Sequence, residues 1–367
     1  MRIPAGLLAR SDGLTAITIV ASLLFPGAAR ALRRPEISRR EIEGLEADLY
    51  LPPGGPWPAV VLVLGALREG RRYPLLEATA RSIAACGFAV LVPELGNLRR
   101  LILADDALDA LAAAVLAVNA EDGVARSPVG LIGFSLGGSL AIVASADDRL
   151  RGRVACVASM GGYFSLTEML TAATTGTIGP RGETASLATP AVFAMAASLV
   201  APLPGPDREL LERALDEDQE APLRALTRVD PESVGPQARA VLTLLGNRDP
   251  HAVPSLIGKV EGAAEMMARF SPETVISRVH VPVWVLHDER DQYVPAQQWR
   301  RWREAAAGRA GFEFVGIRLL EHTEPRAPGL NPVRILRYYL PGLFGLVRFA
   351  YGPLKAVRRS LRTVPAI

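Results

Sequence analysis

The sequence predicts an α/β protein in which a mostly parallel sheet is covered by helices on both faces. Short uninterrupted runs of alanine, valine, leucine and isoleucine alternate with longer helical patterns over the first 160 residues. Such runs are typical of strands buried on both faces, and the alternation is typical of a parallel sheet. The alternation stops after residue 160 and resumes at residue 281, so we expect one α/β core interrupted by a long insertion.

The core elements follow from the apolar runs and from the glycines and prolines that separate them. In the first half we expect strands at residues 47–51, 59–64, 87–92, 129–132 and 154–158, and helices at residues 73–86, 101–118 and 138–146. In the second half we expect strands at residues 281–286 and 313–319, with a helix at residues 296–307 between them. Ligands of parallel sheets bind at the carboxyl ends of the strands, so we expect the site there.

The insertion between the two halves is rich in proline. Its prolines separate short helical patterns such as residues 207–218 and 237–245, because proline bounds a helix more readily than it continues one. We expect a helical cap over the strand ends, which either lines a substrate pocket or packs without touching substrate. The expected parts are an N-terminal segment (1–40), an α/β core (41–160 and 280–330), the cap (161–279) and a C-terminal segment (331–367).

Charge is distributed unevenly along the 367 residues. The chain carries only +3 at neutral pH, yet residues 325–367 contain eight basic and no acidic side chains. Residues 1–40 contain seven arginines and two acidic residues, so the long segment between the two basic ends is net acidic. No recognisable nucleic-acid-binding module accompanies the basic ends, and nucleic acid is not an expected partner.

An uncharged run at residues 14–29 follows Arg2 and Arg10. Three interpretations stay open: a cleaved secretory signal, an anchor at the membrane interface, and a helix packed on the body. Residues 29–31 offer a small-residue cleavage site, but the arginines that follow favour a retained segment. The run is shorter than the roughly 20 residues that a spanning helix needs. We expect a cytoplasmic protein, with peripheral attachment to the inner membrane face and export as open alternatives.

Near the other end, residues 333–351 mix leucine, tyrosine and phenylalanine with arginine as the only charged residue type. This mixture suits the headgroup region of an anionic membrane, where apolar side chains insert and arginines contact phosphates. A helix that packs on the core with a basic exposed face would show the same pattern. An anionic membrane surface is thus one of two interpretations of this segment.

The most specific motif is Gly-Phe-Ser-Leu-Gly at residues 133–137, directly after the strand pattern at residues 129–132. A serine in this motif, between a strand and a helix, lies on a tight turn with its hydroxyl exposed above the sheet. The two glycines remove side chains that would collide at such a turn. Ser135 is therefore the candidate nucleophile.

Candidate partners for this serine follow the last two strand patterns, in the chain order that the motif requires. Asp288 and Asp291 come after the strand at residues 281–286, and both are candidates for the acid. His322 comes directly after the last strand, at the edge where the site is expected. The other three histidines, which we expect to be structural, are His251, His280 and His287.

These motifs together resemble the α/β-hydrolase superfamily, and within it the dienelactone hydrolase-like and serine esterase or peptidase-like branches. The resemblance rests on Gly-Phe-Ser-Leu-Gly-Gly at residues 133–138, Asp-Gln-Tyr-Val-Pro at residues 291–295 and the late His322. It covers residues 47–160 and 281–322, which is under half of the chain. It implies the α/β-hydrolase fold, a helical cap insertion and a serine hydrolase that needs no cofactor.

The resemblance also implies a role for each residue of the site. Ser135 corresponds to the nucleophile, Asp291 to the acid and His322 to the base of a catalytic triad. Asp291 is selected over Asp288 because the family's acid lies three residues before the Val-Pro pair, and Asp288 then caps its own loop. A serine hydroxyl is a poor nucleophile until an imidazole takes its proton, and the carboxylate stabilises the imidazolium that forms.

Two backbone amides are expected to stabilise the oxyanion of such a reaction. One is the amide of Leu136, immediately after the nucleophile. The other is the amide of Ala66, in the loop after the strand at residues 59–64. The family often has His-Gly-x in that loop, where this chain has Leu64-Gly65-Ala66.

We expect a hydrolase that cleaves an ester, thioester or related acyl bond through an acyl-enzyme, with carboxylic ester hydrolysis favoured. The alanine- and leucine-rich cap favours an apolar acyl substrate. The main alternative is a non-catalytic, membrane-associated binding protein, and other chemistry on the same triad is a second, because a fold does not fix a function. The two cysteines, Cys86 and Cys156, are expected to be buried free thiols, and no Cys/His cluster has the spacing of a metal site.

Overall fold

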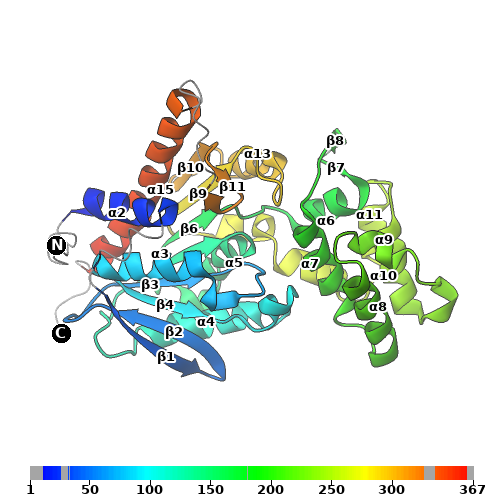
Figure 1. Ribbon diagram of the computed structural model, residues 1–367, viewed down its shortest axis with the longest axis horizontal. Coiled ribbons are helices and arrows are strands. Elements are labelled where there is room, and N and C mark those ends of the chain that lie inside the picture. Colours follow the sequence, from blue (N-terminus) through cyan, green and yellow to red (C-terminus); the bar gives the residue numbers. More distant parts are fainter. Residues whose placement is uncertain (1–10, 26–31, 33, 180, 326–334, 362–367) are drawn as a thin grey trace.

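The computed structural model describes residues 11–25, 32, 34–179, 181–325 and 335–361. At its centre is an eight-stranded sheet with the strand order β1-β2-β4-β3-β5-β6-β9-β10 (Figure 1). The last six strands in this order are parallel to one another, whereas β2 pairs antiparallel with both β1 and β4. The expected mostly parallel α/β sheet is confirmed.

The central strands are short and apolar on both sides. The sheet consists of β1 (Glu36–Ile42), β2 (Leu45–Leu51), β3 (Ala59–Val63), β4 (Ala89–Pro93), β5 (Val129–Phe134), β6 (Val154–Met160), β9 (Val283–Asp288) and β10 (Phe312–Ile317). Along β3, Val60 and Leu62 belong to one apolar cluster, while Val61 and Val63 belong to the cluster on the opposite face. The uninterrupted apolar runs of the sequence therefore reflect burial on both faces.

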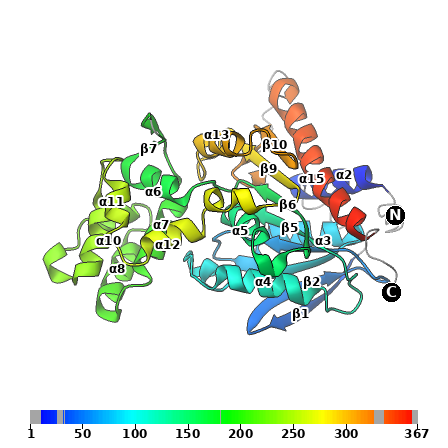
Figure 2. The ribbon, with the colours of Figure 1, turned by 180° about the vertical axis from the view of Figure 1, so that it is seen from behind.

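Helices form a layer on each face of the sheet, as Figure 2 shows from behind. One face carries α2 (Asp12–Leu24), α3 (Pro74–Ala85) and α15 (Leu340–Ser360), which share an apolar cluster with the strands. The other face carries α4 (Ala107–Val118), α5 (Leu136–Ser145) and α13 (Ala296–Ala305), and its cluster continues into the insertion. Core and insertion thus share one apolar interior.

The insertion forms a helical lobe beside the core (Figure 1). Its helices are α6 (Leu166–Thr175), α7 (Thr189–Val200), α8 (Gly205–Glu217), α9 (Pro222–Leu226), α10 (Pro236–Gly246), α11 (Val253–Ile257) and α12 (Ala263–Arg269), and a small hairpin pairs β7 (Thr177–Ile178) with β8 (Glu183–Thr184). Prolines occupy the first turns of α7 to α11, where the missing N–H has no intrahelical partner in any case. The dense prolines therefore begin helices in this lobe.

Several turns connect these elements. A second hairpin, β11 (Leu320–Glu321) with β12 (Glu324–Pro325), follows the last strand of the sheet. Short 3₁₀ helices span Gly70–Arg72, Gly96–Arg100, Asp148–Leu150, Pro231–Ser233, Pro272–Thr274 and Ile276–Arg278, and a π-helical turn at Ile335–Tyr339 leads into α15.

Both terminal helices pack on the core and on each other. Arg358 of α15 donates hydrogen bonds to Asp12 (2.5 Å) and Thr15 (3.1 Å) of α2. Gly352 lies so close to Trp284 of β9 that a Cβ atom there would be 2.3 Å from the indole nitrogen. The packed-helix interpretation thus describes α2 and α15, and the suggested cleavage site at residues 29–31 lies outside the described residues. Within the described chain, no helix has both the length and the apolarity needed to cross a bilayer.

Two expectations about the core are corrected. Residues 101–106 are a loop, and α4 begins only at Ala107. Leu101 adopts a left-handed conformation (φ 60°), and the amide of Leu103 donates to Ser198 of α7, so this apolar stretch packs toward the lobe. In addition, β1 begins at Glu36, so the boundary expected at residue 40 falls inside an edge strand. Its alternating polar residues gave no continuous apolar run.

Candidate active site

Ser135 lies on the sharp turn between β5 and α5, with φ 54° and ψ −133°. Such a positive φ is unfavourable for a residue with a side chain, and it is typical of the strained turn that exposes a nucleophile. A Cβ atom at Gly133 would lie 2.3 Å from the carbonyl oxygen of Gly137, and one at Gly137 would lie 2.2 Å from that of Val63. The two glycines are therefore required by close backbone approach.

Asp291 and His322 form a buried pair, although 31 residues separate them in the chain. Nδ1 of His322 lies 2.7 Å from Oδ2 of Asp291, and the other carboxylate oxygen accepts the amides of Tyr293 (2.7 Å) and Val294 (2.9 Å). Burial alone would raise the pKa of Asp291, but the hydrogen bond from His322 and its positive charge hold that pKa below the ordinary value. A carboxylate held ionised in this way can orient the ring and stabilise an imidazolium.

The second ring nitrogen of His322 is buried and makes no hydrogen bond within the described chain. The ring stacks on Tyr293, with centroids 4.6 Å apart and an angle of 19° between the planes. Ser135 and His322 line the same pocket, and no hydrogen bond joins the two side chains. Catalytic hydrogen bonds often tighten only when substrate binds. Nε2 of His322 has no other hydrogen-bond partner in the described chain, so it is available to accept the proton of Ser135.

Asp288 holds the loop that carries His322. Its Oδ2 accepts the amides of Leu319 and Leu320, both at 2.7 Å, and its Oδ1 accepts the amide of Arg290 at 2.9 Å. The expected cap of its own loop accounts for the hydrogen bond from Arg290, but not for those from Leu319 and Leu320. Burial raises the pKa of this carboxyl, although the hydrogen bonds from the three amides lower it in part. Asp288 therefore ties the end of β9 to the segment that leads into His322.

The other histidines take no part in this arrangement. His287 is buried on β9 and stacks on Trp299, and burial lowers its pKa to about 4, so its ring stays neutral near pH 7. His251 and His280 are exposed, and neither lines a pocket that contains Ser135.

The loop after β3 brings a backbone amide to the nucleophile. A Cβ atom at Gly65 would lie 2.9 Å from Cβ of Ser135 and 3.2 Å from the amide nitrogen of Leu136, so this loop needs a glycine there. Ala66 and Leu136 both line the pocket beside Ser135. Neither amide donates a hydrogen bond within the described chain. The two amides are available as donors to an oxyanion at this position.

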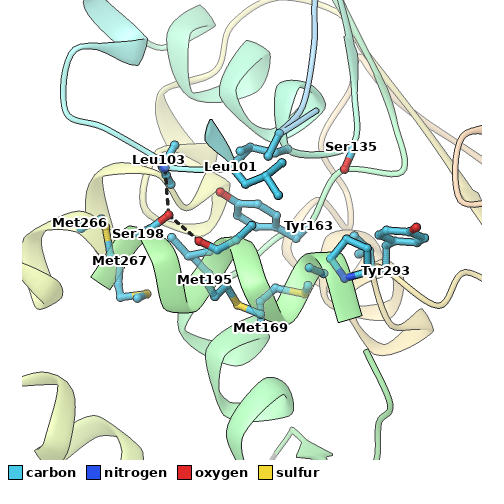
Figure 3. Close-up of a pocket in the computed structure, with 17 residues that line it drawn as sticks. Leu101, Leu103, Ser135, Tyr163, Met169, Met195, Ser198, Met266, Met267 and Tyr293 are labelled. Carbon is cyan, nitrogen blue, oxygen red and sulfur yellow. Dashed lines mark hydrogen bonds between the residues drawn. The ribbon is translucent and has the colours of Figure 1, made fainter. Parts of the chain in front are cut away.

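One pocket beside Ser135 extends under the insertion (Figure 3). We call it the methionine pocket, after Met169, Met195, Met266 and Met267, which line it with Leu101 and Leu103 among others. Figure 3 shows Ser198 turned to the amide of Leu103 and back to its own helix, so its hydroxyl is already paired. Tyr163 likewise donates to the carbonyl of Phe270 at 3.0 Å. The pocket therefore presents an apolar, deformable wall.

A second pocket reaches Ser135 from the side of His322. We call it the tyrosine pocket, and its polar lining comes from Tyr73, Thr79, Tyr293, His322, Thr323 and Glu324. The hydroxyl of Tyr73 donates to Oε1 of Glu324. Both pockets share Ser135, Ala66 and Tyr293. The serine thus stands where two differently lined pockets meet.

Apart from Ser135, Leu136, Ala66 and His322, the residues that line the two pockets were not identified from the sequence. The paired residues Met266 and Met267 were a signal of a deformable apolar wall, since methionine fills irregular gaps. Tyr73 and Glu324 gave no such signal, because more than 250 residues separate them in the chain. Cys86 and Cys156 are free and buried as expected. No group of three metal-ligating side chains occurs among residues placed by the structure.

Comparisons with known proteins agree with this geometry at the level of the fold. No protein-family model matches the chain, and no curated protein matches its sequence. A 2,6-dihydroxy-pseudo-oxynicotine hydrolase superposes with a TM-score of 0.50 at 16% identity, covering 96% of this chain and 81% of its own. An acylaminoacyl peptidase of Pyrococcus horikoshii has a TM-score of 0.51 at 11% identity, covering 92% of this chain and 43% of that one.

A puromycin-hydrolyzing peptidase of Mycobacterium tuberculosis is similar as well, with a TM-score of 0.50 at 18% identity over 91% of this chain and 40% of that one. The chain spans only about two fifths of the length of the two peptidases. At these identities the likeness concerns the fold alone. The protein has the α/β-hydrolase fold, which is the fold that the resemblance of its sequence implied.

Proposed function

We propose that the protein is a serine hydrolase that cleaves an ester, thioester or related acyl bond through an acyl-enzyme. The observation that carries the proposal is the buried pair of Asp291 and His322, whose unpaired Nε2 shares a pocket with Ser135. Nε2 of the buried His287 is also unpaired, but His287 lines neither pocket beside Ser135, so it is the shared pocket together with the paired carboxylate that sets His322 apart.

In the proposed reaction, Oγ of Ser135 attacks the carbonyl carbon while Nε2 of His322 accepts the hydroxyl proton. The amides of Leu136 and Ala66 donate to the oxyanion that forms, and Asp291 stabilises the imidazolium. His322 then gives the proton to the leaving atom as its bond to the acyl carbon breaks. Water enters, is deprotonated by His322 and releases the acid, which restores Ser135.

The methionine pocket supports an apolar acyl group as the preferred substrate part. Besides Ser135 and Tyr293, which it shares with the tyrosine pocket, its polar side chains are Tyr163 and Ser198, and both are already hydrogen bonded to the protein. A polar acyl chain would find no unpaired hydrogen-bond partner on Tyr163 or Ser198. Removal of an alkyl or aryl chain from water, by contrast, is favourable. On this ground we propose an apolar acid as the acyl part of the substrate, and from the resemblance to the dienelactone hydrolase-like and serine esterase or peptidase-like branches we propose a carboxylic ester as the bond that is cleaved.

A fluorophosphonate probe tests the proposal. It should label the folded protein stoichiometrically, and Ser135→Ala should abolish both labelling and ester turnover while leaving thermal unfolding nearly unchanged. Ser145→Ala is the matched control, because Ser145 lies at the far end of the same helix, and it should label like the unchanged protein. Folded protein that takes no label, or a Ser135→Ala variant that is still labelled, would favour the non-catalytic binding protein.

We also propose peripheral association with an anionic membrane, on the cytoplasmic face, through the terminal helices. Six of the eight strongly exposed large apolar side chains in the described chain lie on α2 or around the start of α15. They are Leu14, Ile17, Phe25, Leu336, Leu340 and Phe344. Arg337 and Arg348 lie on the same C-terminal stretch. Exposed apolar groups beside arginines support insertion among anionic headgroups.

A further inference from the structure

The two pockets that meet at Ser135 differ in their relation to the base. His322 lines the tyrosine pocket and is absent from the lining of the methionine pocket, whereas Leu136 lines only the methionine pocket. The base must reach the leaving atom in order to protonate it. If the proposed function holds, the leaving group therefore occupies the tyrosine pocket and the acyl chain occupies the methionine pocket.

The tyrosine pocket has the features of a site for a cation. Its aromatic lining consists of Tyr73, Tyr293 and Phe134 beside five leucines, and one face of the Tyr293 ring is covered by His322. Among the lining residues that the structure describes, Glu324 carries the only carboxylate. No lysine or arginine belongs to that described lining. Aromatic faces attract ammonium groups, most strongly where water is excluded. Within its described lining, the pocket thus combines aromatic rings with one negative charge and no lysine or arginine.

The carboxylate of Glu324 is held in place at the rim. Tyr73 donates its hydroxyl to Oε1, which leaves Oε2 for a ligand. Burial raises the pKa of Tyr73, and the carboxylates of Glu324 and Glu69 raise it further, so the phenol stays a donor.

Deep in the same pocket lies the unpaired Nε2 of His322, whose side chain is nine-tenths buried. This buried acceptor fixes where the leaving oxygen or nitrogen must lie, while Glu324 at the exposed rim fixes the other end of the leaving group. A ligand that joins the two has the leaving atom of its scissile bond at Nε2 and a positive charge at Glu324.

We propose that the tyrosine pocket binds a cationic leaving group, so that the substrate is an ester of an apolar acid with an amino alcohol. In the reaction the bond between the acyl carbon and the alcohol oxygen breaks as the bond to Ser135 Oγ forms. The proton of Ser135 passes through His322 to the departing oxygen. Hydrolysis by water then yields the free acid and the cationic alcohol.

The test compares two esters of butanoic acid that differ only in charge: the 2-(trimethylammonio)ethyl ester and the neutral 3,3-dimethylbutyl ester. The unchanged protein should prefer the charged ester in kcat/KM by about three- to tenfold, the range expected for one cation at an aromatic and partly exposed site. Glu324→Gln should bring the ratio toward one, mainly through KM, and Glu324→Lys should reverse it. Glu324 is exposed, so these variants should fold.

Met195→Ala is the matched control, since Met195 lines only the methionine pocket. It should change the preference among acyl chains and leave the ratio of the two esters unchanged. Raised salt should lower the ratio of the unchanged protein but not that of Glu324→Gln, because salt screens exposed charges.

The competition of alcohols for the acyl-enzyme gives an independent readout. With 4-nitrophenyl butanoate as acyl donor, 2-(trimethylammonio)ethanol should intercept the acyl-enzyme better than 3,3-dimethylbutanol, and Glu324→Gln should remove the difference. Good turnover with no preference for the charged ester or alcohol would overturn this inference alone. Folded protein without turnover and without fluorophosphonate labelling would overturn it together with the proposed function.

Discussion

The ring nitrogen Nδ1 of His322 lies 2.7 Å from Oδ2 of Asp291, and this contact joins the loop after β9 to the hairpin after β10. Neighbouring parallel strands end at the same edge of a sheet, so the two loops can meet only there. The contact leaves the other ring nitrogen facing the pocket of Ser135. The imidazole is thereby fixed in one orientation, and in the proposed reaction Nε2 is the nitrogen that exchanges protons.

The exchange Asp291→Asn tests this orientation. An amide cannot stabilise an imidazolium and can favour the wrong tautomer, so kcat should fall by about three to four orders of magnitude. The rate constant of ester hydrolysis measures the effect, with fluorophosphonate labelling as a second readout. Glu289→Gln on the same loop is the control and should retain near-normal turnover, since Glu289 is exposed and pairs with Arg318. Equal losses in both variants would contradict the assignment.

Asp288→Asn should be damaging for a different reason. An amide has a single acceptor oxygen, so at least one of the three backbone amides now bound to Asp288 would lose its partner. Each unsatisfied buried donor costs about 1–3 kcal/mol, and urea unfolding should show a loss of this size. Turnover should fall about tenfold through displacement of His322. A variant with unchanged stability would show that these bonds do not hold the loop.

Stability should fall in mild acid because of His287. Burial lowers the pKa of His287 from an ordinary 6.5 to about 4. Below pH 6.5 the imidazole is therefore protonated in the unfolded chain, whereas in the folded protein it stays neutral down to about pH 4. The stabilisation is complete above pH 6.5 and is lost as the pH falls toward 4. Between pH 7 and pH 5 the loss should be about 2 kcal/mol. Urea unfolding at both pH values, in the unchanged protein and in His287→Phe, measures it; the variant should lack this part of the loss.

Acyl-chain length should depend on the methionine pocket. Ala194 lines this pocket, and a tryptophan there would fill the space that a long chain needs. In Ala194→Trp, kcat/KM for 4-nitrophenyl decanoate should fall at least about tenfold relative to the acetate, since each buried methylene contributes about 0.8 kcal/mol. Leu116→Trp, at an exposed position on α4, is the bulky control and should keep the original chain-length profile. An unchanged profile in Ala194→Trp would place the acyl chain elsewhere.

Membrane association should depend on the apolar side chains around the start of α15. The double exchange Leu340→Ser with Phe344→Ser removes two strongly exposed apolar side chains, and it should lower binding to anionic phosphatidylserine vesicles about tenfold or more in a sedimentation assay. Leu116→Ser, which removes an exposed leucine from the opposite face, should bind like the unchanged protein. Binding that survives the double exchange would assign these side chains to another contact.

The sheet and its catalytic edge could be predicted because their signals are local. Runs such as Ala59–Val63 are continuous and apolar, and the glycines around Ser135 follow from the turn that they permit. Asp288, Asp291 and His322 were candidates because of their places at strand ends, and the family resemblance selected Asp291 as the acid. By contrast, β1 was missed because an edge strand with polar alternation has no continuous apolar run.

The pockets could not be predicted, since they depend on the convergence of distant segments. Residues 101–103 have a helical pattern but lie in a loop, because Ser198 of the insertion accepts the amide of Leu103 and the leucines face the methionine pocket. For Asp288, the turn could be predicted from the neighbouring sequence. Its hydrogen bonds from Leu319 and Leu320 could not, because they form only when β9 and β10 lie side by side in the sheet.

The contact of Arg358 with Asp12 and Thr15 has a consequence for the order of folding during translation. Helix α2 is made early, but the helix that covers one side of it begins roughly 300 residues later. At about 5–20 residues per second, the apolar side of α2 that α15 will cover waits on the order of 15–60 s at the ribosome. During that interval the nascent chain exposes an apolar helix that chaperones or a bilayer can bind, and its release must await the last helix.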